Sequence, residues 1–371
     1  MRPMFRISKR QMLSLALVIC LAPVFANASG FEGRVSADVD TPIVGAMVTF
    51  RFGSPFQERT VFTAEDGHYQ VSGLPAATDY AIRVRRIGWH DIRTSGSTPD
   101  QGGQQLDFTM VQHTDMAKVA AQLPANHWYA LVLERLTDEN EREQLVRQCN
   151  MCHQRGNAAT RLQRPPEEWH KVLSLMARMG GGLEMEFRKK LPELFNSAYD
   201  PKTAVPRLTK DFGQPDFAPP PDAEVRQAVI DEYEVGGRSS MQHDMIIHSD
   251  GYAYSVDMST DTLFRLDASI PGGDRKAFAI PAGDFPLGGL GADDALPSNS
   301  EMRVGPHSAQ SGPDGAVWIA LAVSNQLAIF DPIKESFVIE DLPGGIFPHT
   351  IRFDDRGRAW YTVAVSNHVG V

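Results

Sequence analysis

The sequence predicts a multidomain chain in which an all-β sandwich, an all-α domain and a partial β-propeller follow one another. Short alternating segments separated by turns such as Asp66-Gly67 predict the sandwich. Apolar residues at helix-compatible spacing from Asp115 onward predict the helical domain. A repeat of a histidine, a glycine and an aromatic residue after residue 236 predicts propeller blades. The length of 371 residues accommodates this number of domains.

The composition is that of an ordinary globular protein. Hydrophobic residues make up 42% of the chain and charged residues 22%, so neither wholesale disorder nor a polytopic membrane protein is indicated. The formal net charge is −10. Because a general nucleic-acid binder carries a concentrated basic face, we expect no nucleic-acid partner, and a cationic partner protein is easier to accommodate.

Residues 1–28 have the pattern of a secretory signal peptide. Four basic residues lie within the first ten positions, an apolar run covers residues 12–25, and Ala26-Asn27-Ala28 supplies small residues before a cleavage site. A retained anchor is the alternative, but the run is shorter than the ~20 residues that span a bilayer. We therefore expect export to the periplasm, loss of Cys20 with the signal, and no stable membrane span afterwards.

Residues 29–112 read as a small all-β module of short strands. Three segments, PIVGA at 42–46, TAEDGHY at 63–69 and GLP at 73–75, resemble the carboxypeptidase regulatory-like family of transthyretin-like sandwiches. The resemblance covers about 80 residues. It implies a non-catalytic accessory domain.

Residues 113–205 are expected to form the all-α domain. Asp138 can cap a helix there, with Glu141 three residues later in a capping-box-like pattern. This helix carries Leu145 and Cys149 on neighbouring turns. It therefore leads directly into the one motif of the chain that carries a specific chemistry.

That motif is Cys149-Asn150-Met151-Cys152-His153. Two thiols and a histidine at this spacing hold a c-type haem, because both cysteines reach the vinyl groups while His153 ligates the iron. A structural zinc site needs a second pair of ligands that the sequence lacks, and a thioredoxin-like motif needs a βαβ context. The helix before the motif resembles the start of class I-like cytochromes c. The sequence thus predicts one covalent haem c in an all-α cytochrome c domain.

The distal haem ligand is expected on the next helix, from Glu167 to about Arg178. The segment with a Glu-Trp pair before Met176 and three glycines after it resembles the small cytochrome domains of quinohaemoprotein dehydrogenases. By that resemblance Met176 is the second axial ligand. Met179 and Met185 remain alternatives, and all three methionines can also be core filler.

Residues 206–235 are rich in proline and predict a semi-rigid, extended linker. The last part of the chain, residues 236–371, contains the repeat. A glycine follows each of His243, His307 and His349 by eight residues, an aromatic residue lies three positions further, and an Asp or Asn ten positions after the glycine. The interval from His307 to His349 is 42 residues, as in a four-stranded propeller blade.

Segments of this repeat, including GPH at 305–307, GPDGAVW at 312–318 and FPH at 347–349, resemble the virginiamycin B lyase (streptogramin lyase) family. The resemblance implies a propeller. That lyase uses a histidine, a magnesium ion and a glutamate soon after a blade tryptophan. No carboxylate follows Trp318 or Trp360 here, so lyase activity is not supported.

Three repeat copies are fewer than the four to eight blades that close a propeller. We expect that the sequence is truncated part-way through the propeller, and the alternative is that a partner completes the ring. The three repeated histidines either line a central channel that binds a ligand or position one blade on the next. Their presence in every copy favours the positioning role.

Taken together, the sequence predicts a periplasmic c-type cytochrome that passes single electrons between redox partner proteins. One alternative is a haem domain that serves an oxidoreductase or lyase site in the propeller. The other is a ligand-binding module formed by the sandwich and the propeller.

Overall fold

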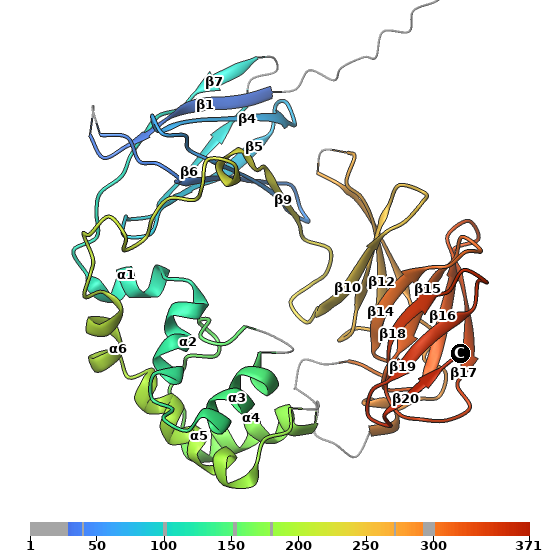
Figure 1. Ribbon diagram of the computed structural model, residues 1–371. Helices are drawn as coiled ribbons and strands as arrows, with labels where there is room; N and C mark the ends of the chain where they lie inside the picture. Colours follow the sequence, from blue (N-terminus) through green and yellow to red (C-terminus); the bar gives the residue numbers. More distant parts are fainter. Residues whose placement is uncertain are drawn as a thin grey trace, which may run out of the picture.

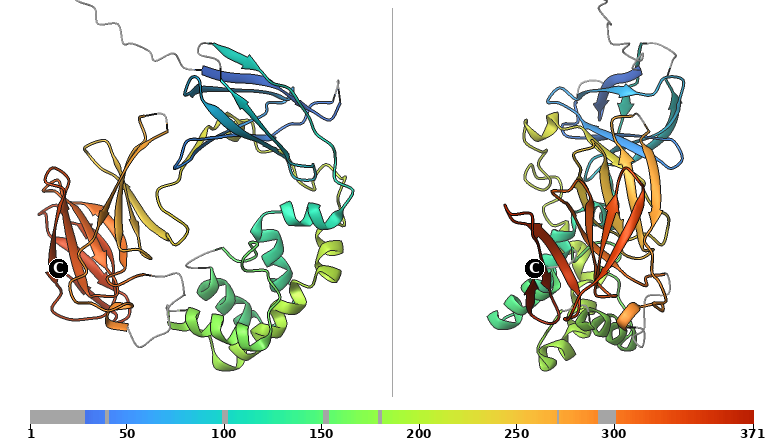
Figure 2. Two further views of the ribbon diagram at one scale, coloured as in Figure 1. Left: turned by 180° about the vertical axis from the view of Figure 1, so that it is seen from behind. Right: turned by 90° about the vertical axis from the view of Figure 1, so that its right-hand side faces the viewer.

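The computed structural model describes residues 29–38, 41–98, 102–150, 154–178, 181–270, 272–291 and 301–371. Over these ranges the chain forms twenty strands, six α-helices and two short 3₁₀ helices. The sandwich lies at the top of Figure 1, with the helices below it on one side and the blade-like sheets on the other. The view from behind in Figure 2 shows the same arrangement.

The predicted fold class, which placed an all-α cytochrome c domain between the sandwich and the propeller, is wrong. The described chain is mostly β-sheet, and its six helices do not make an evident all-α cytochrome c domain. The reason lies in the signals used for the prediction. Helical periodicity and a capping residue specify where helices form, but not how they pack against one another.

The sandwich consists of two sheets around an aromatic core. One sheet has the order β4-β1-β7, with β8 also on β1, and the other has the order β6-β5-β2-β3-β9. Phe31 and Phe50 stack across the core at a centroid distance of 4.9 Å, and Tyr80 meets both rings edge-on. The strands are β1 (Ser29–Ser36), β2 (Met47–Phe52), β3 (Gln57–Phe62), β4 (His68–Leu74), β5 (Asp79–Arg85), β6 (Ile92–Ser97), β7 (Gly103–Gln105) and β8 (Phe108–Thr109).

The fifth strand of the larger sheet comes from the range that was expected to be a linker. β9 (Ile230–Tyr233) pairs antiparallel with β3. The guanidinium of Arg59 holds both carboxylate oxygens of Asp231 at 2.7 Å across this pair. Buried Gln57 donates to Asp231 and accepts from the backbone N–H of Gly272, at 3.3 and 2.6 Å. The sandwich therefore binds both the returning strand and the first blade that follows it.

The helices are α1 (Met116–Gln122), α2 (Ala125–Leu133), α3 (Glu139–Cys149), α4 (Pro166–Arg178), α5 (Met185–Ala198) and α6 (Pro201–Leu208). The predicted cap of α3 is confirmed, because the Asp138 carboxylate accepts from the backbone N–H groups of Asn140 and Glu141. Apolar residues from α2, α3, α4 and α5, such as Trp128 and Phe195, form the core of this helical region.

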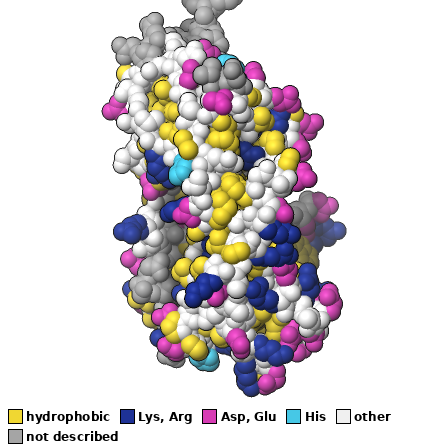
Figure 3. Space-filling model, turned by 90° about the vertical axis from the view of Figure 1, so that its left-hand side faces the viewer, with side chains coloured by type: hydrophobic (Ala, Val, Ile, Leu, Met, Phe, Trp, Pro, Cys, Tyr) yellow, Lys and Arg dark blue, Asp and Glu magenta, His cyan; other side chains and the backbone are white. Residues whose placement is uncertain are grey.

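The helical region docks on the sandwich through Gln122 at the end of α1. Its amide oxygen accepts from the backbone N–H of Gly88, and its amide nitrogen donates to the carbonyl of Trp89, both at 2.8 Å. Acidic and basic side chains are interspersed over the helices on the face shown in Figure 3. Among the described residues, no helix combines the length and the apolar character that crossing a bilayer requires.

Each copy of the sequence repeat forms one antiparallel sheet. The first sheet has β10 (Gln242–Ile247), β11 (Ala253–Asp257), β12 (Thr262–Asp267) and β13 (Asp274–Ala279); the second has β14 (Pro306–Ser311), β15 (Val317–Leu321), β16 (Gln326–Asp331) and β17 (Ser336–Asp341); the third has β18 (Pro348–Phe353), β19 (Ala359–Val363) and β20 (His368–Gly370). Apolar residues of the first and second sheets share one core, and a smaller cluster joins the second to the third.

The repeated polar positions have a local structural reason. Asp261, Asn325 and Asn367 all lie in turns with φ of 49°, 58° and 57°, the left-handed region that Asn and Asp tolerate better than most residues. In each sheet the repeated aromatic residue donates to an aspartate of the preceding turn: Tyr254 to Asp250, Trp318 to Asp314 and Trp360 to Asp354. The repeated residues therefore shape the turns of each sheet and hold its aromatic side chain by a hydrogen bond.

The buried carboxylate of Asp261 joins the first blade to the second, and its removal provides a test. It accepts from the backbone N–H groups of residues 303–305 at 2.6 to 3.3 Å. Asp261→Ala leaves these donors without a partner. We expect amide exchange at 303–305 to accelerate roughly 30-fold, about 2 kcal/mol of local stability. Hydrogen–deuterium exchange mass spectrometry measures this.

The matched control is Asp355→Ala, which removes an exposed aspartate from a turn of the third sheet. We expect no change at 303–305 in this variant. Equal exchange in wild type and Asp261→Ala would contradict the role assigned to Asp261.

Candidate functional site

Cys149, the first residue of the predicted haem motif, is the last residue of α3. Leu145, one turn earlier on the same face, is fully buried, so the thiol of Cys149 is turned toward the helical core and is itself half-buried. This burial raises the pKa of the Cys149 thiol, and the nearby Arg155 guanidinium opposes the rise. Cys152 and His153 lie outside the described residues.

The chain after the motif passes close to α2 at Gly156. A Cβ at this position would lie 2.2 Å from the carbonyl oxygen of Ala125, and the φ of Gly156 is +83°. Only glycine meets both conditions without strain. The close approach brings Arg155 into the core, where its guanidinium lies 5.1 Å from the centroid of the Phe195 ring.

Three buried polar groups around Cys149 have atoms without a hydrogen-bond partner among the described residues. They are the hydroxyls of Tyr129 and Tyr199 and the Nε of Arg155. Burial raises the pKa of both tyrosines to about 12, while the Arg155 guanidinium opposes the rise at both and the Asn150 side chain opposes it at Tyr129. Both phenols are therefore neutral at pH 7. Buried polar atoms are nearly always paired, so these three atoms lack a partner that the described residues do not supply.

Met176 lies near the end of α4. Its carbonyl accepts from the backbone N–H of Gly181 at 2.9 Å, and a Cβ on Gly181 would lie 3.0 Å from the Met176 oxygen and 3.8 Å from that of Gln148. The end of α4 therefore lies beside the end of α3, which carries Cys149. Of the alternatives, Met185 is 68% exposed at the start of α5, and Met179 lies outside the described residues.

The structure also shows what sequence reasoning missed. Tyr129 and Tyr199 lie 20 residues before and 50 residues after Cys149, on α2 and directly after α5. No spacing rule links them to the motif. Arg155 lies two positions after His153, but no pattern in the sequence predicts that its side chain is buried.

The repeated histidines form a column across the three sheets. The ring centroids of His243 and His307 are 3.7 Å apart, and those of His307 and His349 are 4.0 Å apart. Nδ1 of His243 lies 2.7 Å from the backbone oxygen of His307 in the next sheet. This is the geometry of the positioning alternative. Within the described ranges, no three His, Cys, Asp or Glu side chains converge as metal ligands.

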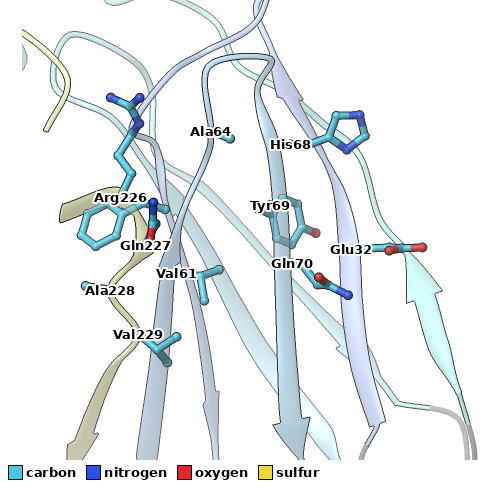
Figure 4. Close-up of a pocket in the computed structure, with 11 residues that line it drawn as sticks. Glu32, Val61, Ala64, His68, Tyr69, Gln70, Arg226, Gln227, Ala228 and Val229 are labelled. Carbon is cyan, nitrogen blue, oxygen red and sulfur yellow. The ribbon is translucent and has the colours of Figure 1, made fainter. Parts of the chain in front are cut away.

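A groove of about 530 Å³ lies on the sandwich, where the chain preceding β9 crosses β3 and β4. Arg226 and Gln227 line it from one side, and Glu32 and His68 from the other (Figure 4). The Arg226 guanidinium is already held by the carbonyl of Pro221 and by the Glu65 carboxylate. The groove therefore has no free charge on this side.

The comparisons with known proteins address the sandwich first. Residues 30–111 match the family model of the carboxypeptidase regulatory-like domain. The N-terminal sandwich is a carboxypeptidase regulatory-like domain. The resemblance predicted for this part of the chain is thereby confirmed. A search of the curated proteins found no match to the chain.

The chain is also structurally similar to solved propellers. A virginiamycin B lyase from Staphylococcus aureus is 17% identical over 39% of this chain and 41% of its own length, with a TM-score of 0.31. A streptogramin B lyase is 16% identical over 39% and 44%, with a TM-score of 0.29. A putative gluconolactonase is 13% identical over 38% and 47%, with a TM-score of 0.27. The chain thus spans less than half the length of these structures.

The buried middle histidine of the column predicts a pH-dependent stability. Burial, with His243 and His349 adding to it, lowers the pKa of His307 to about 3. Because the unfolded chain binds this proton at the ordinary pKa near 6.5, stability is fully present above that pH and is lost as pH falls toward 3. We expect the loss between pH 7 and 4.5 to be roughly 2–3 kcal/mol. Urea unfolding followed by exchange of β14 peptides measures it.

His307→Asn should make this part of the pH dependence disappear, whereas the control His368→Asn, at an exposed position of β20, should retain it. The same slope in wild type and His307→Asn would contradict the assignment.

Proposed function

We propose that this chain is a periplasmic c-type cytochrome that holds one covalent haem and transfers single electrons. Cys149 and Cys152 would form the thioether bonds, and His153 would be an iron ligand. The observation that carries the proposal is the complete attachment motif, whose first thiol lies at the end of an ordered helix and against buried surroundings. Covalent attachment of haem requires only this motif. The proposal therefore does not depend on the all-α domain that was predicted around the motif.

The residues around Cys149 have the chemistry that the edge of a haem would need. The atoms of Tyr129, Arg155 and Tyr199 without a hydrogen-bond partner are donors, and the buried rings of Trp128 and Phe195 belong to the same apolar core. When bound, haem supplies a one-electron iron couple. This chain would supply the two thiols, the axial imidazole and a mostly water-free wall on one side.

Met176 is the proposed second axial ligand. The position of α4 beside the end of α3 supports this choice, as does the exposure of Met185. A thioether ligand raises the reduction potential relative to a second histidine. The protein would therefore accept electrons from weaker reductants than a haem with two histidine ligands can.

The periplasm is the proposed location, because residues 1–28 carry the signal-peptide pattern and c-type haem is attached outside the cytoplasm. Redox partner proteins there are the proposed partners. The net charge of −10 favours cationic surfaces on them. We do not propose a lyase activity for the propeller, because no carboxylate follows Trp318 or Trp360.

Removal of both motif thiols tests the cofactor. In a bacterial host that exports and matures c-type cytochromes, Cys149→Ala together with Cys152→Ala should abolish covalent haem, because no thioether can form. Haem staining after denaturing electrophoresis and the absorption spectrum measure this. Cys20→Ala is the control, since the third cysteine lies outside the motif, and it should leave the haem content unchanged. Haem-free wild-type protein from that host, or covalent haem retained in the double variant, would refute the proposal.

Replacement of the proposed distal ligand tests the iron coordination. Met176→Ala should lower the midpoint potential by more than 59 mV, a tenfold change in the one-electron equilibrium, because the thioether no longer favours the reduced iron. Spectroelectrochemical titration measures this. Met185→Ala, which removes an exposed methionine of the same region, should leave the potential unchanged. The opposite result in the two variants would assign the ligand to Met185.

A further inference from the structure

The helical region contains a buried arginine with no counter-charge. Arg155 is 7% exposed, and no carboxylate of the described residues forms an ion pair with it. Two other arginines of the helical region have such partners: Arg164 lies 4.0 Å from Glu168, and Arg207 lies 3.1 Å from Glu134. Because buried charges are normally paired, an anion bound beside Arg155 would supply the counter-charge that the described residues do not.

Two further donors lie beside this guanidinium. Tyr129 and Tyr199 are 7% and 2% exposed. Neither hydroxyl has a partner in hydrogen-bond geometry among the described residues, as is also true of Nε of Arg155; the Asn150 side chain lies near enough to lower the pKa of Tyr129, but its geometry does not make a hydrogen bond. Tyr199 stacks almost parallel on Phe195, at 6.2 Å and 3°, and the Arg155 guanidinium lies over the same Phe195 ring. The three groups thus lie in one neighbourhood beside Cys149, with which all three interact electrostatically.

The chemistry of these donors defines the ligand. A guanidinium can only donate hydrogen bonds. A buried phenol makes its strongest hydrogen bond when it donates to a charged oxygen. A ligand that satisfies all three groups must therefore accept several hydrogen bonds and carry negative charge. A carboxylate matches the planar fork of arginine and leaves an oxygen for the phenols.

We propose that Arg155, Tyr129 and Tyr199 form a binding site for a carboxylate next to Cys149. This inference rests in part on the proposed function, because a haem attached at Cys149 would itself carry propionate carboxylates. A small free carboxylate is the other source. Gly156 is a positioning residue of the site, since its close approach to α2 turns Arg155 inward.

The first arm of the test uses the haem-loaded full chain. Arg155→Gln removes a positive charge beside the proposed haem, and we expect the one-electron equilibrium to shift about tenfold toward the oxidised state, which is 59 mV. Arg155→Lys should restore part of the shift, because it keeps the charge and loses the fork. Tyr199→Phe should produce a smaller shift of the same sign. Arg164→Gln is the matched control and should have no effect, because this arginine is more exposed and already pairs with Glu168.

The second arm uses the full chain without haem, made by Cys149→Ser with Cys152→Ser. Acetate at 100 times its dissociation constant should stabilise this protein against thermal unfolding as mass action requires, and Arg155→Gln should abolish the effect. If acetate leaves the haem-loaded protein unchanged, the haem propionate fills the site. If acetate stabilises both forms equally, the site takes a free carboxylate.

The two proposals fail separately. Wild-type protein without covalent haem would refute the proposed function, and the acetate titration would still decide whether the carboxylate site exists. If Arg155→Gln changes neither the potential nor the response to acetate, the carboxylate site is overturned while the haem assignment stands. If the haem-free variant does not fold, the potentials of the haem-loaded variants decide alone.

Discussion

The addition of β9 to the sandwich sheet is the interaction on which the arrangement of this chain depends. The strand follows a proline-rich segment and the helical region, yet it pairs with β3 and is held by the two-pronged ion pair of Arg59 and Asp231. Buried Gln57 then connects the same sheet to the first blade. Because the helices dock on this sandwich through Gln122, the sandwich fixes the positions of both other parts.

The helical region shows how buried polarity can mark a site. Apolar packing explains Leu145, Trp169 and most of the core, but it does not explain the burial of Arg155 or of the Tyr129 and Tyr199 hydroxyls. These groups are costly to bury alone and inexpensive to bury with a charged acceptor. A covalent haem beside Cys149 would bring such an acceptor in its propionate groups. The proposed haem would thus account for the buried donors of the proposed carboxylate site.

In the blades the repeat acts mainly on backbone geometry. Asp261 caps the start of the second blade, Asn325 and Asn367 adopt the left-handed turn, and each histidine lies against the next in a column. Every copy must form turns and pack against its neighbour. Residues that are present in every copy therefore have these structural roles. A site with a unique chemistry is therefore better sought outside these positions.

The sequence by itself determined the local features: the CxxCH motif, the Asp138 cap, the sandwich strands and the register of the repeat. Each is written within a few residues, so spacing and propensity suffice. It did not determine the packing of the helices, and the all-α cytochrome c domain predicted from them was wrong. Only the tertiary structure placed β9 in the sandwich and gathered Tyr129, Arg155 and Tyr199 at Cys149, because contacts between residues distant in the chain leave no periodic trace in the sequence.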